Sequence, residues 1–454
     1  SGPIAERTSP LRGPCIGSRS PRNPGRKSGR QRPMKTWHEY THFAALDWAD
    51  DHHDIVVVET RGQIVLELTF PHTAEGWQQL EEALAPWPGL PVAVETNCGP
   101  AVDQLIQRGF TVYPVMPKAA ARYRERQRPS GSKDDRHDAW SLADALRTDG
   151  QGWRALSPLD PLTAELRTVC RDEIILIEER TALVNQLLAA LKEYYPAALE
   201  AFDDWTQPFA WAFVIAFPTP AALQQAGKRK WEKFLHVHRL WRAETAPARL
   251  ALFARATGFA GSPAVTAAKS LLAVALARLL QTLQAQLQTY RERIAVLFAQ
   301  HPDHDLLGSL PGAGPKLAPR LLSELAGTDW EDVPTVQCRA GTAPVTYQSG
   351  QVKRVQVRRA CIHWLRATVH LWANQSRKKS AWAASYYQAH RDKAQSHACA
   401  LRCLGQRWLE IIGGMCRTHA PYDAEKHLRH LQAHGSWVLQ LLRPGPAASA
   451  APAP

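Results

Sequence analysis

Residues 42–48 read HFAALDW, and two more apolar runs follow at once, DIVVVET at 54–60 and QIVLELTF at 63–70. Their β-branched residues predict three short strands, with Arg61-Gly62 as the turn between the second and the third. Consecutive strands joined by short turns form an antiparallel meander. We therefore expect a sheet at the start of the ordered chain.

Helices and strands alternate after this meander. In chain order we expect a helix over 74–85, a strand at PVAVET, a helix over 100–108, a strand at FTVYPV, and helices near 117–124 and 135–147. Three meandering strands followed by alternating helix and strand is the order of the ribonuclease-H-like fold, an α/β architecture. In that fold the first strand lies in the centre of the sheet, close to the end of the fourth.

Two of the predicted strands end in a carboxylate. Asp47 ends the run HFAALD, Glu95 ends PVAVE, and Asp135 and Asp138 follow in KDDRHDA at the start of a helix. Isolated charge is expensive to desolvate, so we interpret the four acids as one divalent-cation site. Carboxylates suit Mg²⁺, with Mn²⁺ as a substitute, and two such ions support phosphoryl transfer on nucleic acid. The alternative is that Asp47 caps a strand and KDDRHDA is an ordinary acidic helix start.

Composition indicates a globular, nucleic-acid-binding protein of more than one domain. The chain has 454 residues, a formal charge of +13 and a sequence pI near 9.5, so a polyanion is the expected partner, with nucleic acid ahead of an acidic membrane. Many of the 16 Trp are flanked by basic residues, as in KRKWEKF and HRLWRAE. This interleaving suits stacking on bases, although most Trp serve as core.

The sequence has no pattern typical of a disulfide-bonded secreted protein, a membrane protein or a histidine metal site. The eight cysteines form no CxxC pair, which favours reduced thiols in the cytoplasm. We find no signal peptide and no membrane-spanning apolar run, so no membrane partner is expected. His52-His53 and His236-x-His238 lack partner ligands, and we interpret them as surface or packing residues.

The middle of the chain predicts two long helices, over 162–200 and 264–300. Long amphipathic helices of this kind pair either with each other or across a dimer. The stretch between them, 201–262, predicts shorter helices with several aromatics, and the sequence assigns it no role.

The C-terminal part predicts a helical domain. LLGSLPGAGPKLAPRLLSELA matches a helix–hairpin–helix, in which Gly312, Gly314 and Lys316 would bind phosphate without reading bases. Further along, basic residues are expected to contact phosphates, with a solvated helix face as the alternative. They are Lys353, Arg354, Arg358 and Arg359, followed by Arg377, Lys378 and Lys379.

Six motifs resemble, in order, those of the DEDD-type insertion-sequence transposases, the bridge-RNA-guided recombinases. They are LDWADDHHD, VAVETNCGP, KDDRHDA, NQLLAALKEYYP, LPGAGPKLAPRLLSELA and AGTAPVTYQSG, and the resemblance covers roughly residues 40–420. It implies a RuvC-like nuclease domain joined by a coiled coil to a C-terminal transposase domain. It also implies that Asp47, Glu95, Asp135 and Asp138 bind Mg²⁺, and that Ser349 attacks DNA to form a phosphoserine link.

Two positions depart from the family pattern. Asp134 stands where the family usually has a small polar residue, so the third ligand is Asp134 or Asp135, and the D-x-x-D-A spacing favours Asp135. After the serine the family often has glycine and lysine, whereas this chain reads RRACIHWLR. DNA contacts there are expected to differ in detail. A serine before glycine is otherwise ordinary in a turn, so the role of Ser349 depends on the resemblance.

Five segments are expected along the chain. They are a disordered basic extension over 1–38, the RuvC-like domain over 39–155, the coiled-coil region over 160–300, the transposase domain over 301–425 and a disordered tail over 440–454. Met34 is our hypothesis for the natural start, which would make 1–33 an added extension. The alternative is a genuine basic arm that contacts nucleic acid.

The resemblance implies a recombinase that moves an insertion sequence, with a guide RNA pairing to donor and target double-stranded DNA. We expect a homo-oligomer, from dimer to tetramer, that works in the bacterial cytoplasm on the nucleoid and polarises the phosphate across a protomer interface. One alternative is a RuvC-like endonuclease that hydrolyses DNA junctions without a covalent intermediate. Another is a nucleic-acid-binding protein without catalysis, which the complete set of acids disfavours.

Overall fold

The computed structural model describes residues 37–127, 135–258 and 261–441, in two compact units that divide between Ser157 and Pro158. The predicted disordered extension and tail lie almost wholly outside these ranges. Trp37 and His38, placed in the extension by the sequence analysis, form a short 3-10 turn with Glu39. The Trp37 ring packs on Tyr113 with centroids 5.7 Å apart, so the ordered domain begins slightly earlier than expected.

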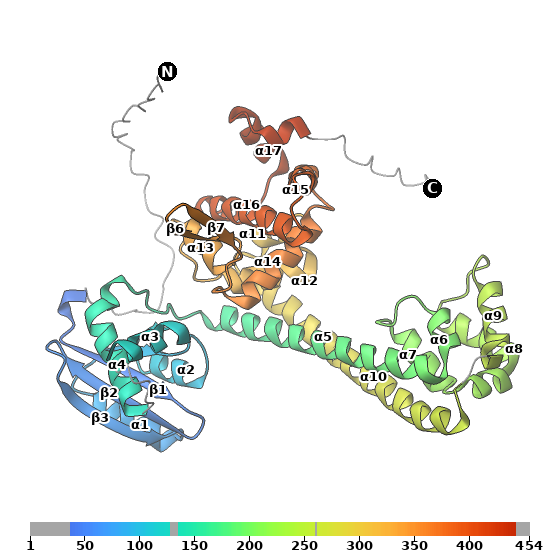
Figure 1. The fold of residues 1–454 in the computed structure, drawn as a ribbon, viewed down its shortest axis with the longest axis horizontal. Helices are drawn as coiled ribbons and strands as arrows, with labels where there is room; N and C mark the ends of the chain where they lie inside the picture. Colours follow the sequence, from blue (N-terminus) through green and yellow to red (C-terminus); the bar gives the residue numbers. More distant parts are fainter. Residues whose placement is uncertain (1–36, 128–134, 259–260, 442–454) are drawn as a thin grey trace. The chain divides into compact units, whose positions relative to one another are not determined.

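The first unit is built on a five-stranded sheet of order β3-β2-β1-β4-β5 (Figure 1). The strands are β1 (His42–Trp48), β2 (His52–Glu59), β3 (Ile64–Pro71), β4 (Pro91–Val94) and β5 (Thr111–Pro114). The first three form the predicted antiparallel meander, while β4 runs parallel to both β1 and β5. The prediction that the first strand lies beside the fourth is confirmed.

Four helices cover the two faces of this sheet. They are α1 (Ala74–Leu84), α2 (Pro100–Gln107), α3 (Pro117–Gln127) and α4 (Asp135–Asp149). Alternate strand residues point to opposite faces, so Leu46 and Ile55 join the core under α1 and α2, whereas Ala45 and Val56 join the core under α3 and α4. Both faces are buried, which explains why the central strands are nearly continuous apolar runs.

Arg61-Gly62 makes the predicted turn between β2 and β3. Gly62 has a φ of +84°, and its N–H donates to the carbonyl of Glu59 at 2.8 Å. Arg147 of α4 donates to the Thr60 carbonyl at 3.1 Å and to Asp144 of its own helix. The turn is thereby tied to the helix that carries part of the acidic motif.

The second unit contains two long helices, α5 (Pro161–Tyr194) and α10 (Pro263–Gln300), that pack along each other (Figure 1). Their contacts run in opposite directions along the sequence, from Glu193 with Lys269 to Glu173 with Arg291, so the pair is antiparallel. Of the two arrangements that the sequence left open, the structure shows pairing within one chain. Asp160 and Ser262 cap the two helices, each followed by proline at the first helical position.

By length and composition α10 would also suit a membrane span, and it is the single such helix among the described residues. The sequence predicted this long helix, but no membrane-spanning apolar run was found in it. One such helix is weak support for a membrane. Leu276, Leu280 and Leu287 are buried in the protein, whereas Leu271 and Leu279 are exposed.

Two hydrophobic cores form around opposite ends of this helix pair. One end carries four shorter helices, α6 (Pro196–Ala201), α7 (Pro208–Ala216), α8 (Pro220–Val237) and α9 (Ala246–Ala254). The other end joins the C-terminal helices α11 (His304–Gly308), α12 (Gly314–Leu325), α13 (Val333–Arg339), α14 (His363–Ser376), α15 (Ala381–Asp392) and α16 (His397–Thr418). A final helix, α17 (Ala424–Ala433), follows.

The C-terminal part is not wholly helical as predicted, because β6 (Val345–Ser349) and β7 (Val352–Gln356) form an antiparallel hairpin. Val345, Val352 and Val355 supply β-branched residues, and Gly350 supplies a φ of +56° in the two-residue turn. Apart from Val345, every residue of both strands is exposed, so the hairpin projects from the helical body.

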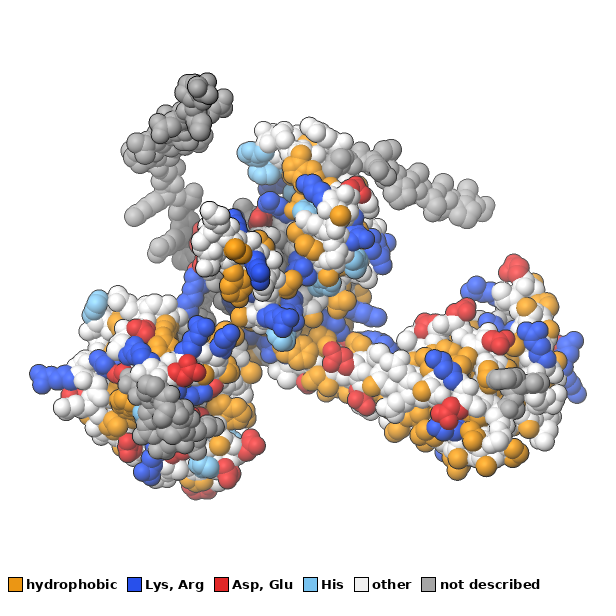
Figure 2. Space-filling view, viewed as in Figure 1, with side chains coloured by type: hydrophobic (Ala, Val, Ile, Leu, Met, Phe, Trp, Pro, Cys, Tyr) orange, Lys and Arg blue, Asp and Glu red, His pale blue; other side chains and the backbone are white. Residues whose placement is uncertain are grey.

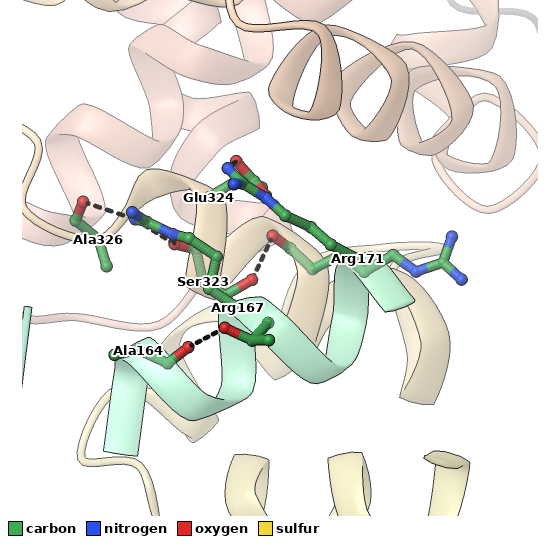
Figure 3. Close-up of polar contacts among 8 residues, drawn as sticks. Ala164, Arg167, Arg171, Ser323, Glu324 and Ala326 are labelled. Carbon is green, nitrogen blue, oxygen red and sulfur yellow. Dashed lines mark hydrogen bonds and ion pairs between the residues drawn. The ribbon is translucent and has the colours of Figure 1, made fainter. Parts of the chain in front are cut away.

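Charged side chains fix α5 to α12 (Figure 3) and to α10. Arg171 makes a two-pronged ion pair with Glu324, at 2.7 and 2.9 Å, and Arg167 donates to the carbonyls of Ser323 and Ala326. Next to them Glu173, only 2% exposed, accepts from Arg320 at 2.8 Å and from Arg291 at 3.0 Å. A buried carboxylate shared by two arginines therefore joins three helices, α5, α10 and α12.

Replacing Glu173 by glutamine is expected to lower the free energy of unfolding of this unit by about 3–5 kcal/mol, because Arg320 would stay buried without its counter-ion. Urea unfolding followed by circular dichroism measures the change. The control is Glu165→Gln, which removes an exposed ion pair between Glu165 of α5 and Arg293 of α10. It should lower the free energy of unfolding by less than about 1 kcal/mol. Equal losses in the two variants would contradict the prediction.

Candidate functional site

Asp47 and Glu95 leave neighbouring parallel strands at the same edge of the sheet. The last aligned pair between β1 and β4 is Leu46 with Val94, so the two acids follow side by side. Asp47 lies on the same face as Ala45, and Glu95 on the same face as Ala93, because strand residues alternate. Both side chains are half-buried and face the layer formed by α3 and α4.

Asp138 reaches this place from the first turns of α4. Ala139 and Leu142 bury α4 against the sheet, and this packing carries Asp138 into the interior, where it is 2% exposed. An ionised carboxylate with so little water contact requires a positive partner.

Arg124 of α3 supplies that partner. Its Nη1 lies 3.0 Å from Oε2 of Glu95 and 3.6 Å from Oδ2 of Asp138. Burial opposes the charged form of the guanidinium. The hydrogen bond that Arg124 donates to Glu95, together with the charges of Asp138, Glu95 and Asp47, nonetheless raises the pKa of Arg124 above its ordinary value. Three of the four predicted acids therefore act on one cationic group.

The donor set fits a hard divalent cation. Every described ligand candidate here is a carboxylate oxygen, the kind that Mg²⁺ and Mn²⁺ prefer. Arg124 stands among these oxygens, and no three acidic, His or Cys side chains of the described residues gather tightly enough to enclose an ion. Asp135 begins α4, but its side chain is outside the described part of the protein, as is Asp134 altogether.

The sequence analysis missed two residues of this site. The helix predicted near 117–124 continues to Gln127 as α3, and it turns Arg124 toward the acids, a contact that the sequence did not predict. The sequence analysis also passed over Asp54, which is 8% exposed, pairs with Asp47 across β1 and β2, and accepts a hydrogen bond from Thr69. The hairpin register could have revealed Asp54, because residues directly opposite in an antiparallel pair share a face.

Replacing Arg124 by alanine is expected to tighten Mn²⁺ binding on the order of tenfold or more, because a competing positive charge leaves the carboxylates. Isothermal titration calorimetry on the DNA-free protein measures it. Arg126→Ala is the matched control, since Arg126 lies on the same helix, is half exposed and pairs with Asp144 instead. Weaker binding after Arg124→Ala would show that the guanidinium organises the acids for the ion and does not compete with it.

Ser349 lies at the end of β6, next to the hairpin turn, and is exposed. It pairs with Val352, while Tyr347 pairs with Arg354 and Gln348 with Lys353. Since directly opposite residues share a face, Tyr347 and Arg354 lie on the face of Ser349, and Lys353 lies on the other.

The other basic residues that the sequence singled out divide into exposed and anchored ones. Lys353, Arg354 and Arg359 are exposed, as are Lys378 and Lys379. Arg358 donates to the carbonyls of Ala343 and Pro344, at the base of the hairpin. Arg377 lies over the Tyr387 ring at 4.6 Å and hydrogen-bonds Asn374. Arg358 and Arg377 therefore have packing roles in addition to any contact with phosphate.

The turn Pro311-Gly312-Ala313-Gly314 joins α11 to α12. Its first two residues pack against α14. A Cβ at Gly312, where φ is +74°, would lie 2.8 Å from the Gln375 backbone, and Trp372 donates to the Pro311 carbonyl. This close approach gives Gly312 a structural role. Gly314 and Lys316 remain exposed at the start of α12, where backbone N–H groups can meet a phosphate.

The histidine pairs behave as surface and packing residues, as predicted. His53 is buried and hydrogen-bonds His72 at 2.7 Å, and burial, helped by the nearby His72, lowers its pKa to about 4. His236 is exposed and stacks on Trp241.

Comparison with known proteins agrees with this arrangement. A transposase family model, of the DEDD type named for IS110, matches residues 44–196, and the model described as the transposase IS116/IS110/IS902 family matches residues 304–388. The first range contains the four acids. The second contains Ser349 and the Pro311–Gly314 turn before α12.

The individual relatives are transposases or insertion-element proteins by name. The chain is 31% identical to the "Mini-circle putative transposase for IS117" of Streptomyces coelicolor over 85% of this chain and 96% of that protein. It is 34% identical to "Putative transposase y4uE" of Sinorhizobium fredii, over 45% of this chain and 59% of that protein. It is 25% identical to an IS110 insertion-element protein of S. coelicolor, over 65% and 73% respectively. The chain therefore belongs to the IS116/IS110/IS902 family of transposases.

Proposed function

We propose that this protein is a site-specific DNA recombinase that excises and inserts a mobile element, cutting and rejoining DNA with a guide RNA. The observation that carries the proposal is the meeting of Asp47, Glu95 and Asp138 around one cationic group in a transposase fold. Nucleic acid is the partner that suits a chain of formal charge +13. The protein would act in the cytoplasm, on nucleoid DNA, as a dimer or tetramer.

Asp47, Glu95, Asp138 and Asp135 are the residues that would hold Mg²⁺ or Mn²⁺. Bound there, the ions supply Lewis-acid polarisation of the phosphate. Asp54, directly opposite Asp47 on the neighbouring strand, would add a further carboxylate to this edge, and Arg124, once displaced from the carboxylates, is available to a phosphate oxygen as a charged donor.

Ser349 is the proposed nucleophile. Its Oγ would form a bond to a DNA phosphorus while the bond from that phosphorus to a sugar oxygen breaks, and the sugar oxygen leaves as a hydroxyl. The exposed hairpin supports this role, because a serine beside a tight turn presents its hydroxyl to a bulky polymer without rearrangement of the core. No described carboxylate or histidine hydrogen-bonds Ser349, so the reactivity has to come from the polarised phosphate.

Arg354 should matter more than Lys353 for this step, because only Arg354 lies on the face of Ser349. Arg354→Gln is expected to lower the rate of covalent adduct formation about 10- to 100-fold, the usual value of one charge-assisted hydrogen bond. Lys353→Gln, an equally exposed cation on the other face, serves as the control and should change the rate only a few-fold. Equal effects would assign both residues to general attraction of DNA.

The use of a guide RNA is tested by identifying the RNA that copurifies with the protein. Expression together with the flanks of its element, followed by purification and sequencing of bound RNA, should recover one noncoding species with segments complementary to donor and target. Heterogeneous cellular RNA in place of a single species would argue against guidance. The same experiment would identify the flank that encodes the RNA.

A hydrolytic RuvC-like endonuclease is the second candidate, since the acids alone would support it. The two activities differ in their products. Hydrolysis by water leaves no protein on the DNA, whereas recombination through Ser349 leaves a protein–DNA adduct that survives denaturation.

A further inference from the structure

The helices over residues 201–258 form a module that the proposed chemistry does not use. They have their own core with the ends of α5 and α10, and they lie between the two ranges that the family models match. A module with a separate core and no share in the acid site or the serine hairpin is a place to look for a second binding surface.

One side of α8 is strongly basic. Trp231, Phe234 and Leu235 face the core, whereas Arg229, Lys230 and Lys233 are exposed on the outer side. Figure 2 shows Lys and Arg side chains gathered at the outer edge of this module. The stretch 228–242 has one acid, Glu232, and six cations, which are Lys228, Arg229, Lys230, Lys233, Arg239 and Arg242.

Most of this charge is not neutralised within the protein. Lys228 lies 3.8 Å from Glu232, and among the described residues the other five cations have no ion-pair partner. Clustered like charges repel one another, so a cluster held on a folded helix favours an anionic partner.

An exposed aromatic platform follows the basic face. Trp241 is 38% exposed, and the His236 ring stacks on it at 4.6 Å with 17° between the planes. Trp231, ten residues earlier in the same basic sequence, is instead buried with its indole N–H bonded to the Leu223 carbonyl. Of these two Trp, one is core and one is open to a ligand.

The backbone that places Trp241 is strained. α8 ends in a Schellman turn, in which Leu240 N–H donates to the Leu235 carbonyl and Arg239 N–H to the His236 carbonyl. Arg239 holds the left-handed position, φ +55°, that glycine normally takes. This turn folds the chain back so that the Trp241 ring lies on His236, and it adds a further exposed cation beside the platform.

We infer that α8 and the turn after it bind a single-stranded stretch of nucleic acid. Arg229, Lys230 and Lys233 would hold successive phosphates, and an unstacked base would lie on the exposed part of the Trp241 ring. Cationic residues beside an exposed flat ring are the usual means of binding single strands without sequence preference. A duplex satisfies only the charges, because its bases are already stacked.

An acidic membrane fits this surface less well. A helix that lies on a membrane needs an apolar face free to enter it. The apolar face of α8 is Trp231, Phe234 and Leu235, and all three are in the core. The inference does not depend on the acid site or on Ser349, and its tests measure binding and not cleavage.

The first test is fluorescence anisotropy of the full-length chain with a labelled oligonucleotide as single-stranded RNA, single-stranded DNA or duplex. Arg229→Gln with Lys233→Gln should lower the slope of log affinity against log salt by about 1.4 for either single strand, roughly 0.7 per lost phosphate contact. Trp241→Ala should weaken single-strand binding about 5- to 100-fold, and Trp241→Phe should restore most of it. The control is Arg255→Gln, an exposed cation of the same module near Glu200.

The second test reads the contact directly, since the full chain has other basic surfaces. Ultraviolet cross-linking to thiouridine-containing RNA, followed by peptide mapping, should give a cross-link in the peptide that contains Trp241. The relative affinities for single-stranded RNA and single-stranded DNA in the first test then show which of the two nucleic acids the site binds. Unchanged affinity and salt slope in all variants, with cross-links elsewhere, would overturn the inference. Loss of duplex binding alone would overturn it as well.

Discussion

Replacing Asp47 by asparagine is expected to abolish DNA cleavage, with the rate falling on the order of a thousandfold or more, because several kcal/mol of metal-derived transition-state stabilisation is lost. Asn keeps the shape of Asp but removes the negative charge at the edge where β1 and β4 end. Asp138→Asn should have the same effect, since the buried Asp138 carboxylate lies at the same site, 3.6 Å from Arg124. Cleavage of labelled donor DNA in the presence of Mg²⁺ or Mn²⁺ measures the effect.

The matched control is Asp103→Asn, an exposed acid on α2 of the same unit. It should leave cleavage unchanged, and all three variants should retain RNA binding within about twofold, because a metal site adds little to phosphate contacts made elsewhere. Circular dichroism shows whether each variant is folded. Cleavage at the full rate by Asp47→Asn would refute the metal site.

Ser349→Ala should remove the covalent protein–DNA adduct completely, since alanine has no atom that can bond to phosphorus. Denaturing gel electrophoresis of labelled DNA after reaction detects the adduct. The fold should be unaffected, because Ser349 is exposed on a projecting hairpin and contributes nothing to the core. Asp47→Asn should also lack the adduct, because the phosphate would no longer be polarised.

Thr346→Ala is the control for the hairpin, since Thr346 is exposed and lies on the opposite face from Ser349. It should form the adduct at nearly the parental rate. An adduct undiminished in Ser349→Ala would assign the covalent link to another residue. Strand cleavage without an adduct in the parental protein would instead support the hydrolytic endonuclease.

Local pattern was sufficient for most of the secondary structure. Apolar β-branched runs and the Arg61-Gly62 turn predict the meander, and helical spacing predicts α5 and α10 to within a few residues at most ends. These elements follow from short-range rules, because each buries one stripe or alternate residues whatever its neighbours are. The β6–β7 hairpin was not predicted, although Val345, Val352 and Val355 and the turn glycine Gly350 lie in its sequence.

The sequence by itself determined that Asp47 and Glu95 close apolar runs at the same kind of place, close to the ends of β1 and β4, because an isolated charge is costly inside a core. Only the tertiary structure decided which other side chains lie beside these two acids. Residue spacing cannot show that α3 turns Arg124 into the acids, that Asp54 faces Asp47, or that Trp241 is exposed while Trp231 is buried. Each of these depends on which helix packs on which face, and that is set by contacts between residues far apart in the chain.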